Sequence, residues 1–148
     1  MVFETNSAKE TKKLGEILAE ELVKIKAKKG ALVLTLSGDL GSGKTTFIQG
    51  LAKGLGIKEK VKSPTFVIAK NYKLKTKNYK LFTHIDAYRL KKSKDILALG
   101  WREMADDPES IIAVEWSKHI AKILLARHID INFKHISENK RKIEFSVE

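Results

Sequence analysis

The sequence predicts an α/β fold with three layers, in which helices cover a mixed parallel and antiparallel sheet that ends in a C-terminal hairpin. Two short, almost wholly apolar segments, 31–36 and 111–114, are typical of strands buried on both faces of a sheet. Segments of helical periodicity lie between the predicted strands, and residues 129–147 alternate between apolar and polar side chains. The length of 148 residues predicts one domain, over residues 1–148.

The first half of the chain contains an edge strand, two helices and a buried strand. Residues 1–6 are expected to add a short edge strand, and Ser7 and Glu10 have the spacing of a capping box that begins a helix. The buried strand 31–36 follows this helix, then a glycine-rich loop and a second helix over Lys44–Lys53. Apolar residues at helical spacing extend the first helix to about Lys28, before Gly30 ends it; they are Leu14, Ile17, Leu18, Leu22 and Ile25.

The second half contains more strands than helices. Ser63 and Pro64 break the chain, and strands are predicted over Thr65–Tyr72 and Tyr79–Asp86, with a turn between them at 75–78. The remaining predicted elements are a helix over 95–104, the buried strand 111–114, a short helix over 117–125 and a hairpin that turns at 137–140.

The composition is that of a globular protein, with 43% hydrophobic and 32% charged residues. The chain has no cysteine, which excludes a disulfide framework, a thiolate zinc site and a cysteine nucleophile, and fits a reducing compartment. The longest uncharged apolar run, Gly30–Gly38, is far shorter than the roughly 20 residues that span a membrane. Glu4, Lys9 and Glu10 precede any apolar run, unlike in a signal peptide, so we expect a cytoplasmic protein that does not enter a membrane.

Residues Gly38–Thr45 read GDLGSGKT and match the phosphate-binding loop G-x-x-x-x-G-K-[ST]. Glycines allow backbone N–H groups to turn toward a phosphate, and the following helix directs the positive end of its dipole at the same place. In such a loop the lysine reaches the β and γ phosphates, and the hydroxyl after it ligates Mg²⁺. The residues expected to contact the nucleotide are therefore Asp39, Gly41, Ser42, Gly43, Lys44, Thr45 and Thr46.

A P-loop enzyme also needs an acidic residue to hold the metal or to act on water, usually where a strand ends. Asp86 ends the predicted strand 79–86, and Glu115 directly follows the buried strand 111–114. Each acid alone is also compatible with a helix cap or a surface position. The sequence leaves open which of the two is the metal ligand and which acts on water.

Three further features have two readings each. The segment Ser63–Phe66 lies about where many P-loop proteins place a switch that senses the γ-phosphate, but it also has the composition of a plain turn. The four histidines lack metal-ligand spacing, and His84 is interpreted as a packing or hydrogen-bonding residue rather than a catalyst. Trp116 is either a core residue or a cover over the site.

The formal net charge is +11, and the segment Lys58–Lys80 holds eight Lys and one Glu, a net +7. Such a surface attracts an anionic partner, and the alternative is an ordinary solvated face. We expect this segment to meet an acidic protein or the anticodon arm of a tRNA.

Four motifs together resemble one family. GDLGSGKTTF (Gly38–Phe47), SPTF (Ser63–Phe66), HIDAYRL (His84–Leu90) and EW (Glu115 and Trp116) occur in the order and spacing of the TsaE family, also called YjeE. The P loop alone is shared by many families, whereas this combination is specific. The resemblance extends over nearly the whole chain and identifies it with small bacterial ATPases needed to make threonylcarbamoyladenosine in transfer RNA.

The resemblance implies a P-loop α/β domain that hydrolyses ATP slowly with Mg²⁺ and serves the TsaB–TsaD complex. It implies that Lys44 and Thr45 take the phosphates and Mg²⁺, that Glu115 is the metal-side acid, and that Asp86 is a hydrolytic or switch acid. It also implies that Trp116 covers the site, that Thr11 lies near the nucleotide and that Arg141 lies near the adenine. One departure is Ser117-Lys118 after the Glu-Trp pair, where the family often has a proline.

Two other functions compete with the ATPase. A small-molecule or nucleoside kinase would use the same loop but usually needs an arginine-bearing lid, and the chain has four arginines spread along it. A nucleic-acid-binding module would use the Lys58–Lys80 segment, with affinity that falls steeply as salt rises. A GTPase is less favoured still, because the chain has no guanine-reading N-K-x-D segment: Asn139–Lys142 reads NKRK and lacks the acid.

Overall fold

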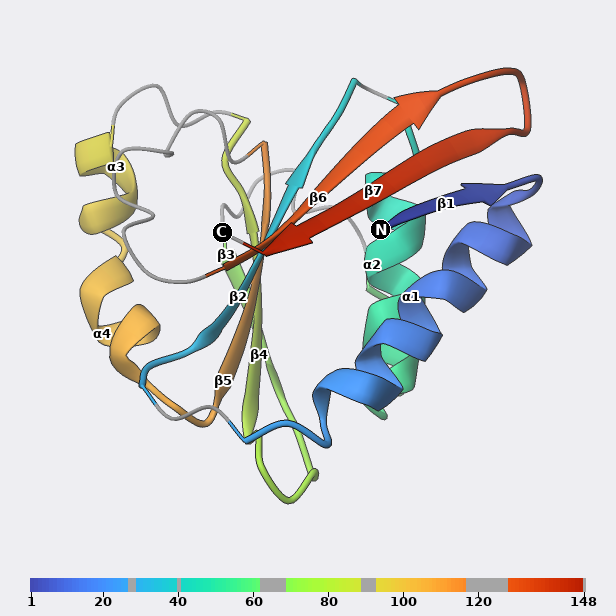
Figure 1. Cartoon of the computed structure of the whole chain (residues 1–148). Coiled ribbons are helices and arrows are strands. Elements are labelled where there is room, and N and C mark those ends of the chain that lie inside the picture. The colour runs from blue at the N-terminus through green and yellow to red at the C-terminus, as the bar shows by residue number, and fades with distance from the viewer. Residues whose placement is uncertain (27–28, 40, 62–68, 89–92, 117–127, 148) are drawn as a thin grey trace.

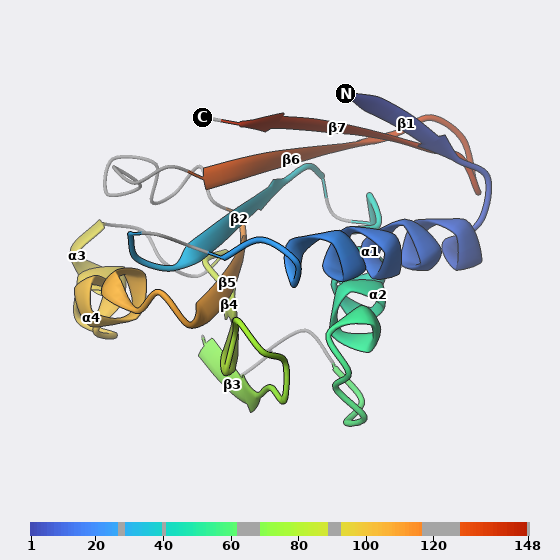
Figure 2. The ribbon, with the colours of Figure 1, turned by 60° about the horizontal axis from the view of Figure 1, so that its bottom comes forward.

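The computed structural model describes residues 1–26, 29–39, 41–61, 69–88, 93–116 and 128–147. A seven-stranded sheet runs through the middle of the molecule (Figures 1 and 2). Helices α1 (Ala8–Leu22) and α2 (Lys44–Gly54) lie on one face of it, and α3 (Ser93–Leu97) and α4 (Trp101–Asp106) lie on the other. The predicted three-layer α/β fold is confirmed.

The sheet is mixed, in the order β1-β7-β6-β2-β5-β4-β3. Its central strands β6, β2, β5 and β4 are parallel, and antiparallel pairs add β3 at one edge and β7 and β1 at the other. The predicted C-terminal hairpin is the pair β6–β7, and the predicted N-terminal edge strand is β1. The strands are β1 Val2–Thr5, β2 Leu32–Ser37, β3 Ala69–Lys73, β4 Leu81–Asp86, β5 Ser110–Glu115, β6 His128–His135 and β7 Arg141–Val147.

The register of the parallel strands brings the predicted acids beside the P loop. Leu36 of β2 pairs with Glu115 of β5, and Glu115 pairs with Asp86 of β4. The carboxyl ends of these three strands therefore form one edge of the sheet, and the P loop leaves β2 at the same edge. In open α/β sheets this is the edge where ligands bind.

Helices α1 and α2 approach each other closely at two glycines. A Cβ added at Gly50 of α2 would lie 1.8 Å from the carbonyl oxygen of Lys12, and one added at Gly15 of α1 would lie 2.2 Å from that of Phe47. Only glycine permits so close an approach of two backbones. The start of α1 is thereby held next to the start of α2, where the P loop ends.

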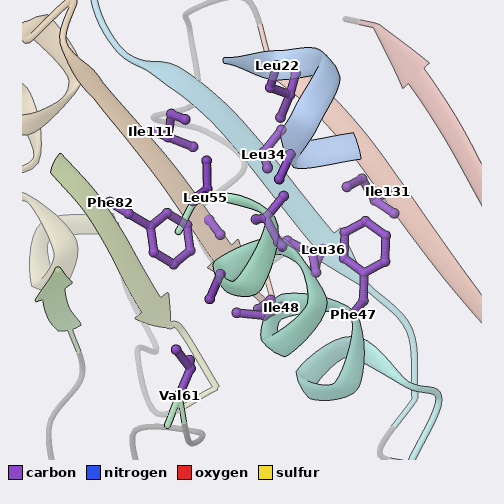
Figure 3. Packing of buried hydrophobic residues seen from close by; sticks show 14 of the residues in the cluster. Leu22, Leu34, Leu36, Phe47, Ile48, Leu55, Val61, Phe82, Ile111 and Ile131 are labelled. Carbon is purple, nitrogen blue, oxygen red and sulfur yellow. The ribbon is translucent and has the colours of Figure 1, made fainter. Parts of the chain in front are cut away.

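The larger hydrophobic core lies between this helix pair and the sheet. Figure 3 shows Phe47 and Ile48 of α2 packed near Leu34 and Leu36 of β2, and all four side chains are completely buried. A smaller cluster on the opposite face surrounds Trp101 of α4. Residues of β2, β4 and β5 alternate between the two clusters, as strands buried on both faces require.

Helix α1 begins as predicted and ends early. The backbone N–H of Glu10 donates to Ser7 Oγ at 3.1 Å, and the Glu10 carboxylate accepts from the backbone N–H of Asn6 at 3.0 Å. The helix ends at Leu22 rather than near Lys28. Side chains of a later segment take the next carbonyls, since Asn78 Nδ2 donates to Val23 O and the Tyr79 hydroxyl donates to Ile25 O.

Two further details of the helices differ from the sequence pattern. Ile17 and Ile25 belong to the apolar pattern that predicts the first helix, yet they are 46% and 56% exposed, and Ile25 lies beyond the end of α1. The helix predicted over 95–104 is two helices, α3 and α4, because Gly100 between them has the left-handed φ of 83°. The SPTF segment, residues 65–68 of the strand predicted over Thr65–Tyr72, and the helix predicted over 117–125 lie outside the described residues. Within the described part of the chain, every helix is too short or too polar to cross a membrane.

Candidate nucleotide-binding site

A cavity of about 390 Å³ opens at the carboxyl edge of β2, β4 and β5. The P loop, the start of α1, the residues after β4 and β5, and the turn between β6 and β7 surround it. Asp39 is the one predicted site residue that does not line the cavity, although its backbone carbonyl accepts a hydrogen bond from Lys44. The predicted residues that do line it are Thr11, Gly41, Ser42, Gly43, Lys44, Thr45, Thr46, Asp86, Glu115, Trp116 and Arg141.

The P loop turns into α2 at Gly43, which caps the helix with a left-handed φ of 102°. Side-chain carbons of Thr11 of α1 and Arg141 of β7 lie beside this glycine, at 3.5 Å and 3.8 Å from the position that a Cβ would take there. Residues far apart in the sequence thus pack on the backbone of the loop. The free N–H groups at the start of α2 and the positive end of its dipole suit an anion.

Lys44 is a buried cation, only 5% exposed. Its Nζ donates hydrogen bonds to the carbonyls of Gly38 and Asp39, and lies 4.0 Å from the ring centroid of Trp116. Burial lowers the pKa of Lys44 from its usual value near 10.5, and the carboxylates of Glu115, Asp39 and Asp86 oppose this shift. Among the described residues no carboxylate lies within 4.0 Å of this Nζ, so the site holds a positive charge without a direct ion pair.

Glu115 is a buried carboxylate, 3% exposed, whose two oxygens have different partners. The Thr45 hydroxyl donates to Oε1 at 3.4 Å, and Nε2 of His84 lies 2.6 Å from Oε2. His84 belongs to β4 and is completely buried. We name Lys44, Thr45 and Glu115 the inner end of the cavity.

Trp116 packs on the inner end. Its ring lies over Nζ of Lys44 and 5.1 Å from the ring of Tyr88, which is 60% exposed. Trp116 has a left-handed φ of 61°, a conformation that costs a non-glycine residue on the order of 1–3 kcal/mol. Its backbone N–H donates to Leu36 O at 2.9 Å, which ties the strained residue to β2. Asp86 accepts a hydrogen bond from the backbone N–H of Tyr88 at 3.0 Å.

The opposite end of the cavity is built from surface groups. Arg141 donates through Nη1 to the carbonyls of the β6–β7 turn and through Nη2 to Gly41 O at 3.2 Å. Its guanidinium therefore joins the turn to the P loop. Buried Thr11 shares a 2.7 Å hydrogen bond with the Thr5 hydroxyl of β1. We name Ser7, Glu138, Asn139 and Arg141 the outer end of the cavity.

The side chains at the inner end suit Mg²⁺ bound together with a phosphorylated ligand. Mg²⁺ prefers oxygen ligands and is commonly held by one or two protein groups, substrate phosphates and water. The Thr45 hydroxyl and Glu115 Oε1 are two such oxygens side by side. The described residues contain no group of three or more His, Asp or Glu side chains able to enclose a metal, so the rest of the shell falls to ligand and solvent.

Five lining residues lie outside the set that the sequence predicts. Tyr88 has a signal in the sequence, since it belongs to the motif HIDAYRL. Ser7, Ala8, Glu138 and Asn139 reach the cavity only through the packing of α1 and the β6–β7 turn around the P loop.

A family model described as threonylcarbamoyl adenosine biosynthesis protein TsaE matches residues 5–143. The chain is 39% identical over 137 residues to a TsaE protein of Rickettsia felis, which covers 92% of this chain and 74% of the relative. It is 37% identical over 115 residues to the TsaE protein of Bacillus subtilis, covering 78% and 69%.

A solved structure agrees with the sequence comparisons. The crystal structure of Bacillus subtilis YdiB superimposes with a TM-score of 0.75 and 32% identity, covering 98% of this chain and 83% of that one. The fold, the cavity beside the P loop and the sequence matches thus agree, and the chain belongs to the TsaE family.

Proposed function

We propose that this protein is an ATPase that supports the formation of threonylcarbamoyladenosine in tRNA by acting on a TsaB–TsaD complex. One observation carries the ATPase proposal: the Thr45 hydroxyl and the Glu115 carboxylate are in contact directly beside a P loop that holds a buried lysine. The role in tRNA modification is supported by the family to which the chain belongs.

Each residue at or beside the inner end has a task in this proposal. Nζ of Lys44, which contacts the carbonyls of Gly38 and Asp39, binds the β and γ phosphates of ATP instead when the nucleotide is present. The phosphates then place negative charge next to this buried cation. Thr45 and Glu115 hold Mg²⁺, which when bound neutralises charge on the phosphates. Asp86, one strand from Glu115, orients the attacking water. Trp116, whose ring packs on Lys44, shields the inner end from bulk solvent.

The isolated protein is expected to hydrolyse ATP slowly. P-loop hydrolases need additional positive charge at the transferring phosphate, often from an arginine in cis or in trans. Among the described residues Arg141 is the arginine that lines the cavity, and its guanidinium is engaged by backbone carbonyls. Arg89, the nearest arginine in sequence to Asp86, and the predicted switch Ser63–Phe66 lie outside the described residues. We therefore propose that the partner complex completes the site.

The partner surface is assigned to the basic strip, five exposed lysines on β3 and its turn to β4. None of the five makes an ion pair with a described residue, so their charges are available to an anionic surface. Such a strip speeds association with an acidic protein or with RNA. The strip consists of Lys70, Lys73, Lys75, Lys77 and Lys80.

Steady-state phosphate release from ATP, with and without purified TsaB–TsaD, tests this function. We expect slow release alone and a clear stimulation by the pair. Rapid release that the pair leaves unchanged would contradict partner gating, and release that requires a small-molecule phosphate acceptor would identify a kinase.

The partner surface is tested by reversing Lys70, Lys73 and Lys75 to Glu. The matched control reverses Lys12, Lys94 and Lys134, which are exposed elsewhere. We expect the first triple variant alone to lose stimulation while keeping its basal rate. Equal stimulation in both triple variants would move the contact away from the strip.

A further inference from the structure

We propose that His84 is a positioning residue for the metal-side acid: it holds one oxygen of the Glu115 carboxylate, so that the other faces Thr45 and the cavity. The inference rests on the proposed ATPase function and adds to it a residue of a neighbouring strand, beneath the cavity lining.

The contact pattern of the Glu115 carboxylate supports this assignment. Oε2 lies 2.6 Å from Nε2 of His84, while Oε1 accepts from the Thr45 hydroxyl at 3.4 Å. A carboxylate only accepts hydrogen bonds, so the donor is the Nε2–H group of the imidazole. The short contact fixes one oxygen, and the longer one leaves the second oxygen able to accept a different ligand.

Strand geometry places His84 and Asp86, two residues apart on β4, on the same face of the sheet. Side chains at i and i+2 of a strand point to the same face, so His84 and Asp86 both point toward the face of the sheet that carries α2. Asp86 pairs with Glu115 in the register of β4 and β5, whereas His84 pairs with Ala113, one step further from the cavity. Strand β4 thus supplies the Asp86 carboxylate to the cavity and the His84 imidazole to the buried side of Glu115.

The burial of His84 favours a role directed at Glu115 over simple packing. The ring is completely buried, and Nδ1 has no hydrogen-bond partner among the described residues. An unsatisfied buried polar atom costs about 1–3 kcal/mol, which an apolar side chain would avoid. Without the imidazole, Glu115 at 3% exposure would lose its short hydrogen bond and keep only the 3.4 Å contact with Thr45, and a poorly satisfied buried carboxylate is costly. Groups that orient a metal ligand in this way typically change metal affinity 10–100-fold when removed.

The test compares three variants by titration calorimetry with ADP, at increasing MgCl₂ and in EDTA. His84→Leu removes the donor, and His84→Gln keeps an N–H at the reach of Nε2. Thr83→Val is the matched control, because Thr83 is equally buried on β4 but bonds Asn71 on the other face. We expect His84→Leu to need about 10-fold more Mg²⁺ for tight ADP binding. The other two variants should stay within about 2-fold of wild type, and affinity in EDTA should change little in all three.

Unchanged Mg²⁺ dependence in folded His84→Leu would overturn the inference, and so would a loss in His84→Gln as large as in His84→Leu. Should His84→Leu not fold, the imidazole ¹⁵N signals of His84 in the wild-type protein test the proposal instead. These signals are assigned by their absence from the spectrum of His84→Gln. They should shift when Mg²⁺ joins the ADP complex, and no shift would overturn the proposal. Failure of the wild-type protein to bind ADP at all would instead contradict the proposed ATPase function.

Discussion

The two ends of the cavity are built in different ways. At the inner end, Lys44 and Glu115 are charged side chains with 5% and 3% exposure, fixed by partners in neighbouring strands and the P loop. At the outer end, Arg141 is half-buried, Glu138 and Asn139 are exposed, and the bonds that shape the wall run to backbone carbonyls. The buried charged side chains thus lie at the end where phosphate chemistry is proposed. Substitutions at the inner end should therefore change activity and nucleotide binding more than substitutions at the outer end.

The largest effect is expected for Lys44→Ala at the inner end. The variant removes the charge that would contact the transferring phosphate, and electrostatic contacts of that kind are worth about 3 kcal/mol, or on the order of 100-fold in rate. Phosphate release under saturating MgATP measures it. Turnover near the wild-type rate would contradict the proposal that the P loop binds the phosphates of ATP.

The next effect separates the two acids. Glu115→Ala should raise the Mg²⁺ concentration required for nucleotide binding by about 10-fold, because Glu115 contacts the Thr45 hydroxyl. Asp86→Ala should change it less, because Asp86 is bonded to the backbone of Tyr88. Titration of MgCl₂ against each variant checks the order. The reverse order would assign the metal to Asp86 and the water to Glu115.

A smaller effect is expected at the outer end. Arg141→Ala removes the bridge between Gly41 O and the β6–β7 turn, so ADP should bind roughly 3- to 10-fold more weakly, the cost of a hydrogen bond or two. Arg102→Ala, at an exposed position of α4, is the matched control. An Arg141 variant with wild-type affinity would show that this wall does not support the nucleotide.

The smallest effect concerns pH and stability without ligand. Burial lowers the pKa of Lys44, so between the folded-state value and about 10.5 the unfolded chain binds more protons than the folded one. The free energy of unfolding of the wild type should therefore rise through that window relative to Lys44→Met, which has no titrating group there. Urea unfolding from pH 7 to 10 measures the difference. A difference that is constant with pH would mean that Lys44 is solvated in the folded state.

The sequence predicted the inner end better than the outer end for a physical reason. The P loop and the two acids are local patterns at strand ends, and parallel strands must place those ends together. Ser7 and Asn139 have no local signal, since they reach the cavity through helix packing and a hairpin turn. Arg141 was found only through the family resemblance.

The errors in the fold share one cause, which is competition between distant segments. Helical periodicity continues past Leu22, but the hydrogen bonds from Asn78 and Tyr79 to the backbone of Val23 and Ile25 replace the next helical turn. No local pattern announces such partners. The break between α3 and α4 is different, because its cause is local: Gly100 adopts a left-handed conformation, which ends one helix before the next begins.

The glycine contact between α1 and α2 has a consequence for reading sequence variation. Gly15 and Gly50 admit no Cβ, so even alanine would push two backbones apart. In a saturation library selected for function, both positions should be as depleted of substitutions as Lys44, although neither lines the cavity. Such a library would then mark two sites as intolerant of substitution: the cavity around Lys44, for its chemistry, and the helix contact at Gly15 and Gly50, for its packing. Nucleotide binding by the few survivors at position 15 or 50 would tell them apart.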